Sequence, residues 1–288
     1  MTSVALLQIV LACWATMPVV DDLDAAVTTA RRRECRLMVM VGLPQREARR
    51  LGSWIGWSVG PSVRRRLAGD WVVASISDRS AIGRLSDRAR REGWLSGWST
   101  WDVRMLEAPS LALVDFTDVT SPRYGEVDFV APLDRPEVVS PKSLETMLTL
   151  PAGAWTQRLL MYAVRVHGEG PRSADSALSP LLVESVARHA AHQAAIRLQG
   201  HHGWERRFQE LLRELPGDLI PYEVCAESWP GENAYEAALE CVRSWRQSPG
   251  HWRLVAMPNR FFAYDMARGA NGIWYGTGIF AIPRASAP

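Results

Sequence analysis

The stretch from Glu240 to Ala281 constrains the fold of this chain more than any other part. A helix-like run ending at Trp245 is followed by the loop Ser248-Pro249-Gly250-His251 and then by two strand-like runs rich in glycine and aromatic residues. Proline and glycine stop a helix and let the backbone turn sharply. We therefore expect His251 on an accessible turn, where its imidazole can bind a ligand or simply be solvated.

Length and composition indicate two ordinary globular domains. The 288 residues, with a net charge of +2, can form two cores and carry no charge excess that would require a nucleic acid or an anionic membrane as partner. Lys142 is the only lysine, so arginine clusters reflect the general composition and carry little functional information.

The four cysteines form no CxxC motif and no finger-type metal spacing. Cys225 and Cys241 could pair in an oxidising compartment or remain buried thiols.

An apolar segment opens the chain. Residues 1–20 have the apolar character of a secretory signal core, although no lysine or arginine precedes it. A buried first strand or helix fits the same residues. We expect an extracytoplasmic or secreted protein, with a cytoplasmic location as the alternative. No later stretch is long and uncharged enough to span a bilayer.

The first half, residues 21–150, predicts an α/β domain with the element order β-α-β-α-β-β-α. Its strands are expected as apolar runs covered on both faces, and Pro109 stands before the third of them. This order and this proline resemble the thioredoxin fold, in which the proline is cis and faces a redox dithiol at the start of a helix. The corresponding helix start here, residues 42–47, contains no cysteine. Thiol-disulfide exchange needs an attacking thiolate, so we expect a thioredoxin-like domain without redox activity.

A Pro-Gly break at residues 150–153 marks the expected domain junction. The second domain is expected over residues 151–288. An amphipathic helix from Leu181 to Leu198 carries His189 and His192, which lie one turn apart and could share a metal ion. Because no third ligand is near them in sequence, we expect both to be surface or interface residues.

Several motifs of the second half follow one another in the order found in one protein superfamily. They are RLLMYAVRVH, ARHAAHQAA, GHHGWERR, CAESW, SWRQSPGHW and GIWYGTGIF. Together they resemble the CAP domain of cysteine-rich secretory and plant pathogenesis-related proteins, whose bacterial members are called SCP-like. The resemblance covers about residue 155 to the end. It implies an α-β-α sandwich whose cleft carries two histidines and two acidic residues and can hold a divalent metal, often zinc.

The resemblance assigns the cleft residues one by one. The first histidine corresponds to His201, with His202 as the competing position, and the second corresponds to His251. The first acidic residue corresponds to Glu227 in CAESW, and the second acidic position is occupied by Ser248. The ligands of a bound metal ion would therefore be His201, Glu227 and His251. Two imidazoles and one carboxylate can hold zinc with water completing the shell, although the loss of one carboxylate should lower the affinity.

Other interpretations of these residues stay open. Glu232 lies in a literal Gly-Glu-Asn triplet that the family also shows, close to the helix that ends at Trp245. Independently of the family, His201 and His251 each follow a helix beside a glycine and could converge on Glu227. Such a set suits metal binding or acid-base chemistry. It could equally have a structural role, in which the carboxylate bonds both imidazoles and fixes the two loops.

No nucleophile stands out in the sequence. Ser228 and Ser248 are near the expected cleft but lack an elbow sequence such as GxSxG. Cys225 is a minor alternative, as a thiol nucleophile beside His251.

We therefore expect a non-redox thioredoxin-like module joined to a CAP-like domain that binds a small molecule, lipid, peptide or envelope polymer. The alternative is a metal-dependent hydrolase or peptidase that uses His201, Glu227 and His251. Imidazole nitrogens about 3 to 4 Å apart, across the position of a metal ion, would favour the metal-dependent enzyme. Imidazoles locked by a carboxylate would favour the binding protein.

Overall fold

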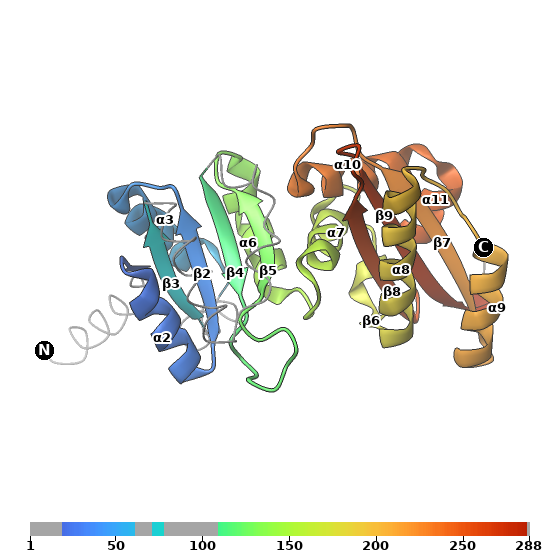
Figure 1. Ribbon diagram of the computed structural model, residues 1–288, viewed down its shortest axis with the longest axis horizontal. Coiled ribbons are helices and arrows are strands. Elements are labelled where there is room, and N and C mark those ends of the chain that lie inside the picture. Colours follow the sequence, from blue (N-terminus) through green and yellow to red (C-terminus); the bar gives the residue numbers. More distant parts are fainter. Residues whose placement is uncertain (1–18, 61–70, 78–108, 287–288) are drawn as a thin grey trace, which may run out of the picture. The chain divides into compact units, whose positions relative to one another are not determined.

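A computed structural model describes residues 19–60, 71–77 and 109–286 of the chain (Figure 1). Its contacts divide the chain into two compact units, Met1–Thr149 and Leu150–Pro288. Each unit contains one mixed β-sheet with helices packed on it, so the prediction of a mixed α/β chain is confirmed. The apolar segment 1–18 and the residues between 78 and 108, where a further helix was expected, lie outside the described residues.

The sheet of the first unit has five strands in the order β1-β3-β2-β4-β5. β1, β3 and β2 are parallel, whereas β4 is antiparallel to both β2 and β5. Nearly every side chain of β2 to β5 is buried, as unbroken apolar runs predict for strands covered on both faces. The strands are β1 Val19–Val20, β2 Arg36–Val41, β3 Trp71–Ile76, β4 Ser110–Val114 and β5 Val127–Pro132.

Local side chains account for both ends of the first helix of this unit. The Asp22 carboxylate accepts hydrogen bonds from the backbone N–H groups of Asp24 and Ala25, which caps the first helix. Three arginines in its last turn interact favourably with the helix dipole. The peptide bond before Pro109 involves Ala108, which lies outside the described residues. The helices are α2 Leu23–Arg33, α3 Gln45–Ser58, the 3-10 helix η3 Pro136–Val139 and α6 Pro141–Thr149.

The sheet of the second unit is built around β9. Its order is β6-β8-β9-β7, and β9 is antiparallel to both neighbours, whereas β6 is parallel to β8. All residues of β9 except the last are buried, so this strand forms the centre of the core. The strands are β6 Ala177–Leu178, β7 Leu219–Glu227, β8 Phe261–Arg268 and β9 Trp274–Pro283.

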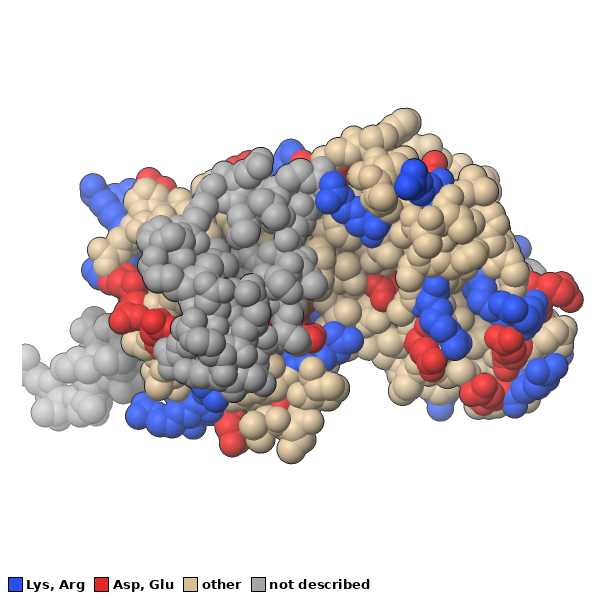
Figure 2. Space-filling view, in the orientation of Figure 1, with Lys and Arg blue, Asp and Glu red and all other residues tan. Residues whose placement is uncertain are grey.

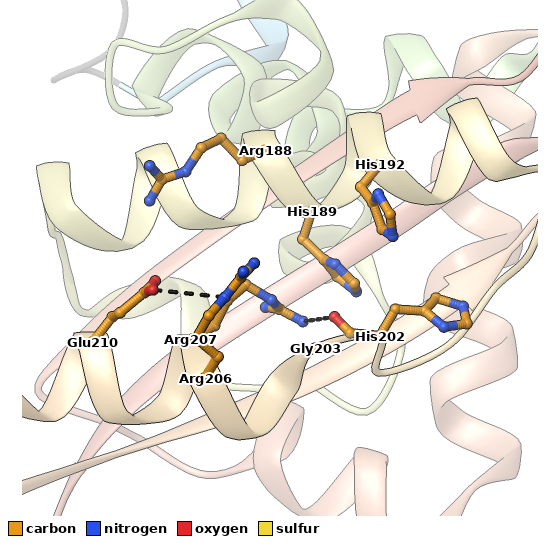
Figure 3. A pocket seen from close by; sticks show the side chains of 8 residues that line it. All are labelled: Arg188, His189, His192, His202, Gly203, Arg206, Arg207 and Glu210. Atoms are coloured by element: carbon orange, nitrogen blue, oxygen red, sulfur yellow. Dashed lines mark hydrogen bonds and ion pairs between the residues drawn. The ribbon is translucent and has the colours of Figure 1, made fainter.

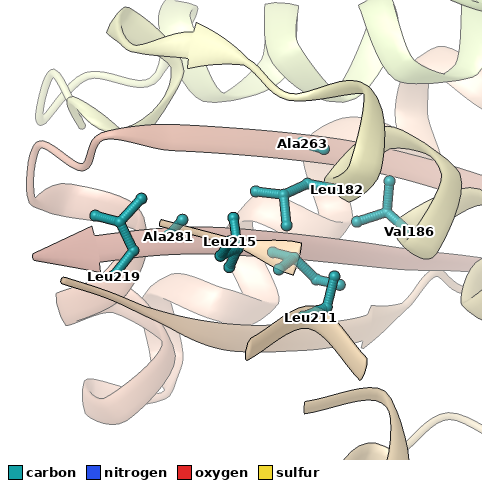
Figure 4. Close-up of a cluster of buried hydrophobic side chains, with 8 residues drawn as sticks. Leu182, Val186, Leu211, Leu215, Leu219, Ala263 and Ala281 are labelled. Atoms are coloured by element: carbon teal, nitrogen blue, oxygen red, sulfur yellow. The ribbon is translucent and has the colours of Figure 1, made fainter. Parts of the chain in front are cut away.

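Helices cover both faces of this second sheet. On one face, Leu182 and Val186 of α8 pack with Leu211 of α9 and with Ala281 of β9 (Figure 4). On the other face, a Cβ at Gly276 would meet side chains of α7 and α10. The unit therefore has three layers, helices, sheet and helices. The helices are α7 Trp155–Val166, the 3-10 helix η4 Ser173–Asp175, α8 Pro180–Ile196, α9 Trp204–Glu214, α10 Ala234–Gln247, α11 Pro249–Ala256 and the 3-10 helix η5 Arg284–Ser286.

The expected turn around Pro249 is a helix start instead. α10 ends at Gln247 and α11 begins at Pro249, with Ser248 as the residue between them. Proline suits the first position of a helix, because its missing N–H is not needed there and its φ is already helical. His251 therefore lies in the first turn of α11, where its backbone is fixed, rather than on an open loop.

The close packing of β9 leads to a first prediction. A Cβ at Gly278 would lie 2.6 Å from Cε1 of Tyr264 and 2.9 Å from Cγ2 of Val224, and both neighbours are buried. Gly278→Ala should therefore lower the free energy of unfolding by about 1–3 kcal/mol, the usual cost of overpacking. Urea unfolding followed by circular dichroism measures this change. Gly168→Ala is the control, because nothing lies within 4 Å of its Cβ. Equal midpoints for the two variants would contradict the prediction.

Candidate functional site

Two histidines that are 50 residues apart in the sequence meet in the second unit, as the sequence predicts. Nε2 of His201 lies 3.4 Å from Nε2 of His251, and the ring centroids are 5.6 Å apart. His201 belongs to the loop between α8 and α9, and its side chain is 43% exposed. His251 is half-buried. We call these two residues the imidazole pair. Because both side chains are partly exposed, the pair is accessible from solvent.

The carboxylate beside this pair is Glu223, whereas the sequence predicted Glu227. Oε1 of Glu223 lies 2.9 Å from Nδ1 of His201. An ionised carboxylate only accepts hydrogen bonds, so Nδ1 carries a hydrogen. In the neutral ring, the lone pair of Nε2 then faces His251. Glu227 is exposed and lies on the same face of β7, four residues and roughly 13 Å farther along the strand.

Glu223 is fully buried and surrounded by basic groups. The Arg207 guanidinium donates hydrogen bonds to both of its carboxylate oxygens, and Nε2 of His189 is 3.7 Å away. Burial alone would raise the pKa of Glu223, but the hydrogen bonds from His201 and Arg207 outweigh burial and lower that pKa below its usual value. The carboxylate therefore stays anionic inside the fold.

His189 fixes the position of the loop that carries His201. Its ring is buried, contrary to the predicted surface position, and Nε2 donates a hydrogen bond to the Gly200 carbonyl oxygen at 2.9 Å. The Gly200 N–H donates in turn to Oε1 of Gln193 at 3.0 Å. His189 and Gln193 both lie on α8, so this helix binds both the N–H and the carbonyl oxygen of Gly200. Burial lowers the pKa of His189, although nearby Glu223 opposes the shift.

A second group of possible ligands lies beneath the imidazole pair. Ligand atoms of His189, Glu223 and Cys225 all lie within 4.8 Å of one another, so this group could hold a metal ion. Arg207 already forms an ion pair with the Glu223 carboxylate, however, and its positive charge would repel a metal cation. Burial also raises the pKa of the Cys225 thiol well above its usual value. The protonated thiol is a poor metal ligand and a poor nucleophile.

The remaining predicted residues have structural contacts. Ser248 joins two helices, and its carbonyl oxygen accepts a hydrogen bond from the Trp252 N–H at 2.8 Å. Ser228 Oγ accepts a hydrogen bond from the Trp274 N–H and donates one to the Trp229 carbonyl oxygen. Glu232 accepts a hydrogen bond from the Trp229 N–H at 3.1 Å. Cys225 and Cys241 are free, buried thiols.

Sequence reasoning missed Glu223, Arg207 and the role of His189. A signal for Glu223 was present, because strand alternation in EVCAE places it on the same face as Glu227. Arg207 and His189 carry no such signal. Their helices had to be packed on the sheet before either side chain could be placed beside a carboxylate.

Comparisons with known proteins add little to this geometry. No family model matches the sequence, and no curated protein matches it. Among solved structures, the chain is similar to an outer surface protein from Borrelia burgdorferi, at 12% identity and a TM-score of 0.33, over 43% of this chain and 90% of that one. At these values the likeness carries no information on activity. No helix among the described residues is long and apolar enough to cross a bilayer.

The buried ion pair predicts a large stability effect. Glu223→Gln keeps the shape of the side chain but leaves the Arg207 guanidinium without its counter-charge. Breaking a buried pair in this way costs about 3–5 kcal/mol, so the urea midpoint should fall sharply. Glu227→Gln, at an exposed position on the same strand face, should change the free energy of unfolding by less than about 0.5 kcal/mol. Similar midpoints for both variants would show that Glu223 is not the buried anchor.

The lowered pKa of His189 predicts a pH dependence for the metal-free protein. Below the ordinary value of 6.5, the unfolded chain binds a proton that the folded chain does not bind. Stability from this residue should therefore be complete above that pH and should decline as pH falls toward 5. His189→Gln should flatten the plot of thermal midpoint against pH in this window, because glutamine does not titrate. Parallel curves for both proteins would contradict the prediction. The contribution of Glu223 is lost only at lower pH, below its usual pKa of 4.5.

Proposed function

We propose that the imidazole pair binds zinc in a CAP-like ligand-binding unit. The observation that carries this proposal is the 3.4 Å between Nε2 of His201 and Nε2 of His251. Two nitrogens bound to one tetrahedral zinc at the usual Zn–N distance lie about 3.3–3.4 Å apart. The same distance also suits a direct N–H···N hydrogen bond, so the test must detect the metal itself.

The surroundings of the pair fit a metal-binding role. A metal-binding histidine commonly donates its second ring N–H to a carboxylate, which fixes the ring and raises its basicity. Glu223 provides this contact for His201. Burial, together with nearby His201, lowers the pKa of His251, which favours the neutral imidazole that a metal requires.

The proposed ligand would bind beside the metal. Zinc held by two imidazoles would supply an electrophilic centre with open coordination positions for water and for an oxygen of the ligand. His201 and His251 would hold the ion, and Glu223 would orient His201. A small molecule, lipid headgroup, peptide or envelope polymer with an exposed oxygen donor fits this site.

The folds of the two units support a thioredoxin-like module joined to a CAP-like module. In the first unit, the strand order β1-β3-β2-β4-β5 with its parallel and antiparallel pairs supports a thioredoxin-like module. Residues 42–47 contain no cysteine, which supports a role without redox chemistry. In the second unit, helices on both faces of the sheet and the imidazole pair support a CAP-like module.

A metal-dependent hydrolase or peptidase is the second candidate. It is favoured by the 3.4 Å between the two Nε2 atoms, which is the spacing expected for this candidate, and by the exposure of His201, which would let a substrate reach a metal held there. Hydrolysis of chromogenic esters and peptides would distinguish the candidates. An enzyme should lose this activity with a chelator and with His251→Ala, whereas a binding protein should show none.

The zinc proposal predicts a specific set of binding results. The protein should bind one zinc ion at neutral pH, and His201→Ala and His251→Ala should each lower the affinity by at least about tenfold, since loss of even an outer-sphere contact costs that much. Equilibrium dialysis with elemental analysis measures both effects. His192→Ala is the control, because this residue lies outside the pair and should leave the affinity unchanged.

Cobalt substitution identifies the ligands. Thiolate charge-transfer absorption would assign the metal to the group that contains Cys225 and would exclude the imidazole pair. Absence of bound zinc in the unaltered protein would also exclude it, and the 3.4 Å contact would then be a hydrogen bond between the rings.

A further inference from the structure

A cavity of about 410 Å³ lies between α8 and α9, and neither His201 nor His251 is among its lining residues (Figure 3). Basic side chains dominate its lining, and Glu210 is its one acidic residue. We call it the cationic pocket. Its basic residues are Arg188, His189, His192, His202, Arg206 and Arg207. Figure 2 shows positively and negatively charged side chains interspersed on one face of this second unit.

Three imidazoles gather at one end of this pocket (Figure 3). The ring centroids of His189, His192 and His202 are 6.0 to 6.5 Å apart in all three pairs. Each neutral imidazole offers one N–H donor. Nε2 of His202 is buried and has no hydrogen-bond partner among the described residues.

Arg207 forms a rigid donor within the lining. Its side chain is only 12% exposed, and its terminal nitrogens bond Glu223 and the His202 carbonyl oxygen. Its guanidinium also lies over the Trp204 ring, 5.1 Å from the centroid. Its Nε is buried and finds no partner in the described part of the chain. A buried donor without a partner is unfavourable, and an acceptor atom in the pocket would remove that cost.

The other two arginines are free to reorient. Arg188 and Glu184 form an exposed pair at 3.2 Å, and Arg206 and Glu210 form another at 3.7 Å. Exposed ion pairs of this kind contribute little to stability. Both guanidinium groups can therefore turn toward an anion in the pocket at small cost.

We propose that the cationic pocket binds a small molecule that carries a phosphate group. Planar guanidinium groups hold a phosphate through paired N–H···O bonds. His192 and His202 can add further donors, whereas the N–H of His189 is already donated to the Gly200 carbonyl oxygen. The cavity volume lies in the range of small-molecule sites, which leaves room for the rest of a phosphate ester. A metal ion fits poorly, because three arginines would repel it.

The pocket does not share the proposed zinc ligands, because neither His201 nor His251 lines it. His189 and Arg207 of its lining do contact Glu223. Binding is therefore tested on the metal-free protein, with chelator present and ionic strength held constant. Isothermal titration is carried out with inorganic phosphate, with glycerol 3-phosphate and with glycerol. We expect both phosphates to bind and glycerol not to bind. Tighter binding of the ester identifies a phosphorylated molecule as the ligand class, and equal affinities identify the phosphate ion itself.

Variants locate the site. The double variant Arg188→Gln, Arg206→Gln should weaken phosphate binding by at least about tenfold, as expected for losing charged hydrogen bonds. Both positions are exposed, so the fold should persist, which circular dichroism checks. Arg213→Gln, at an exposed position in the last turn of α9, removes a positive charge from outside the pocket lining. It is the control and should bind as the unaltered protein does.

Three results would overturn the proposal. The first is no phosphate binding without metal. The second is equal weakening by the double variant and by Arg213→Gln, which would indicate only general charge attraction. The third is phosphate binding that requires zinc and disappears in His251→Ala, which would place the anion on the metal instead. That last result would leave the zinc proposal standing.

Discussion

A single buried carboxylate determines the arrangement of the functional part of this protein. Glu223 projects from β7 and meets His201 from a loop, Arg207 from α9 and His189 from α8. Three separate segments are thus tied to the sheet through one charged group. Burying a lone carboxylate would be strongly unfavourable, so its basic neighbours are a condition of the fold. Because these neighbours also border the imidazole pair and the cationic pocket, both sites depend on this contact.

Much of the fold could be predicted because its signals are local. Apolar runs in the first half predicted strands covered on both faces. The meeting of His201 and His251 was also predicted, since each follows a helix beside a glycine that lets the chain turn. These features depend on short stretches of sequence, whose preferences agree with the final structure.

The errors concern choices that local sequence does not determine. Glu223 and Glu227 lie on the same face of β7, and only the position of the loop along the strand decides which one meets His201. Pro249 is compatible with ending one helix and with starting another, and the packing of α11 decides between them. The cationic pocket was not predicted because its residues come from two helices and a loop. Arginine abundance also hid the relevant ones.

The loop between α8 and α9 has a consequence for how this protein can vary. Its adjacent residues His201 and His202 serve different places, one facing His251 and the other lining the cavity beside His192. Gly203, with φ of 65°, then turns the chain into α9. An insertion or deletion of one residue here would move both rings relative to α8 and β7. The length of this short connection therefore constrains both places at once.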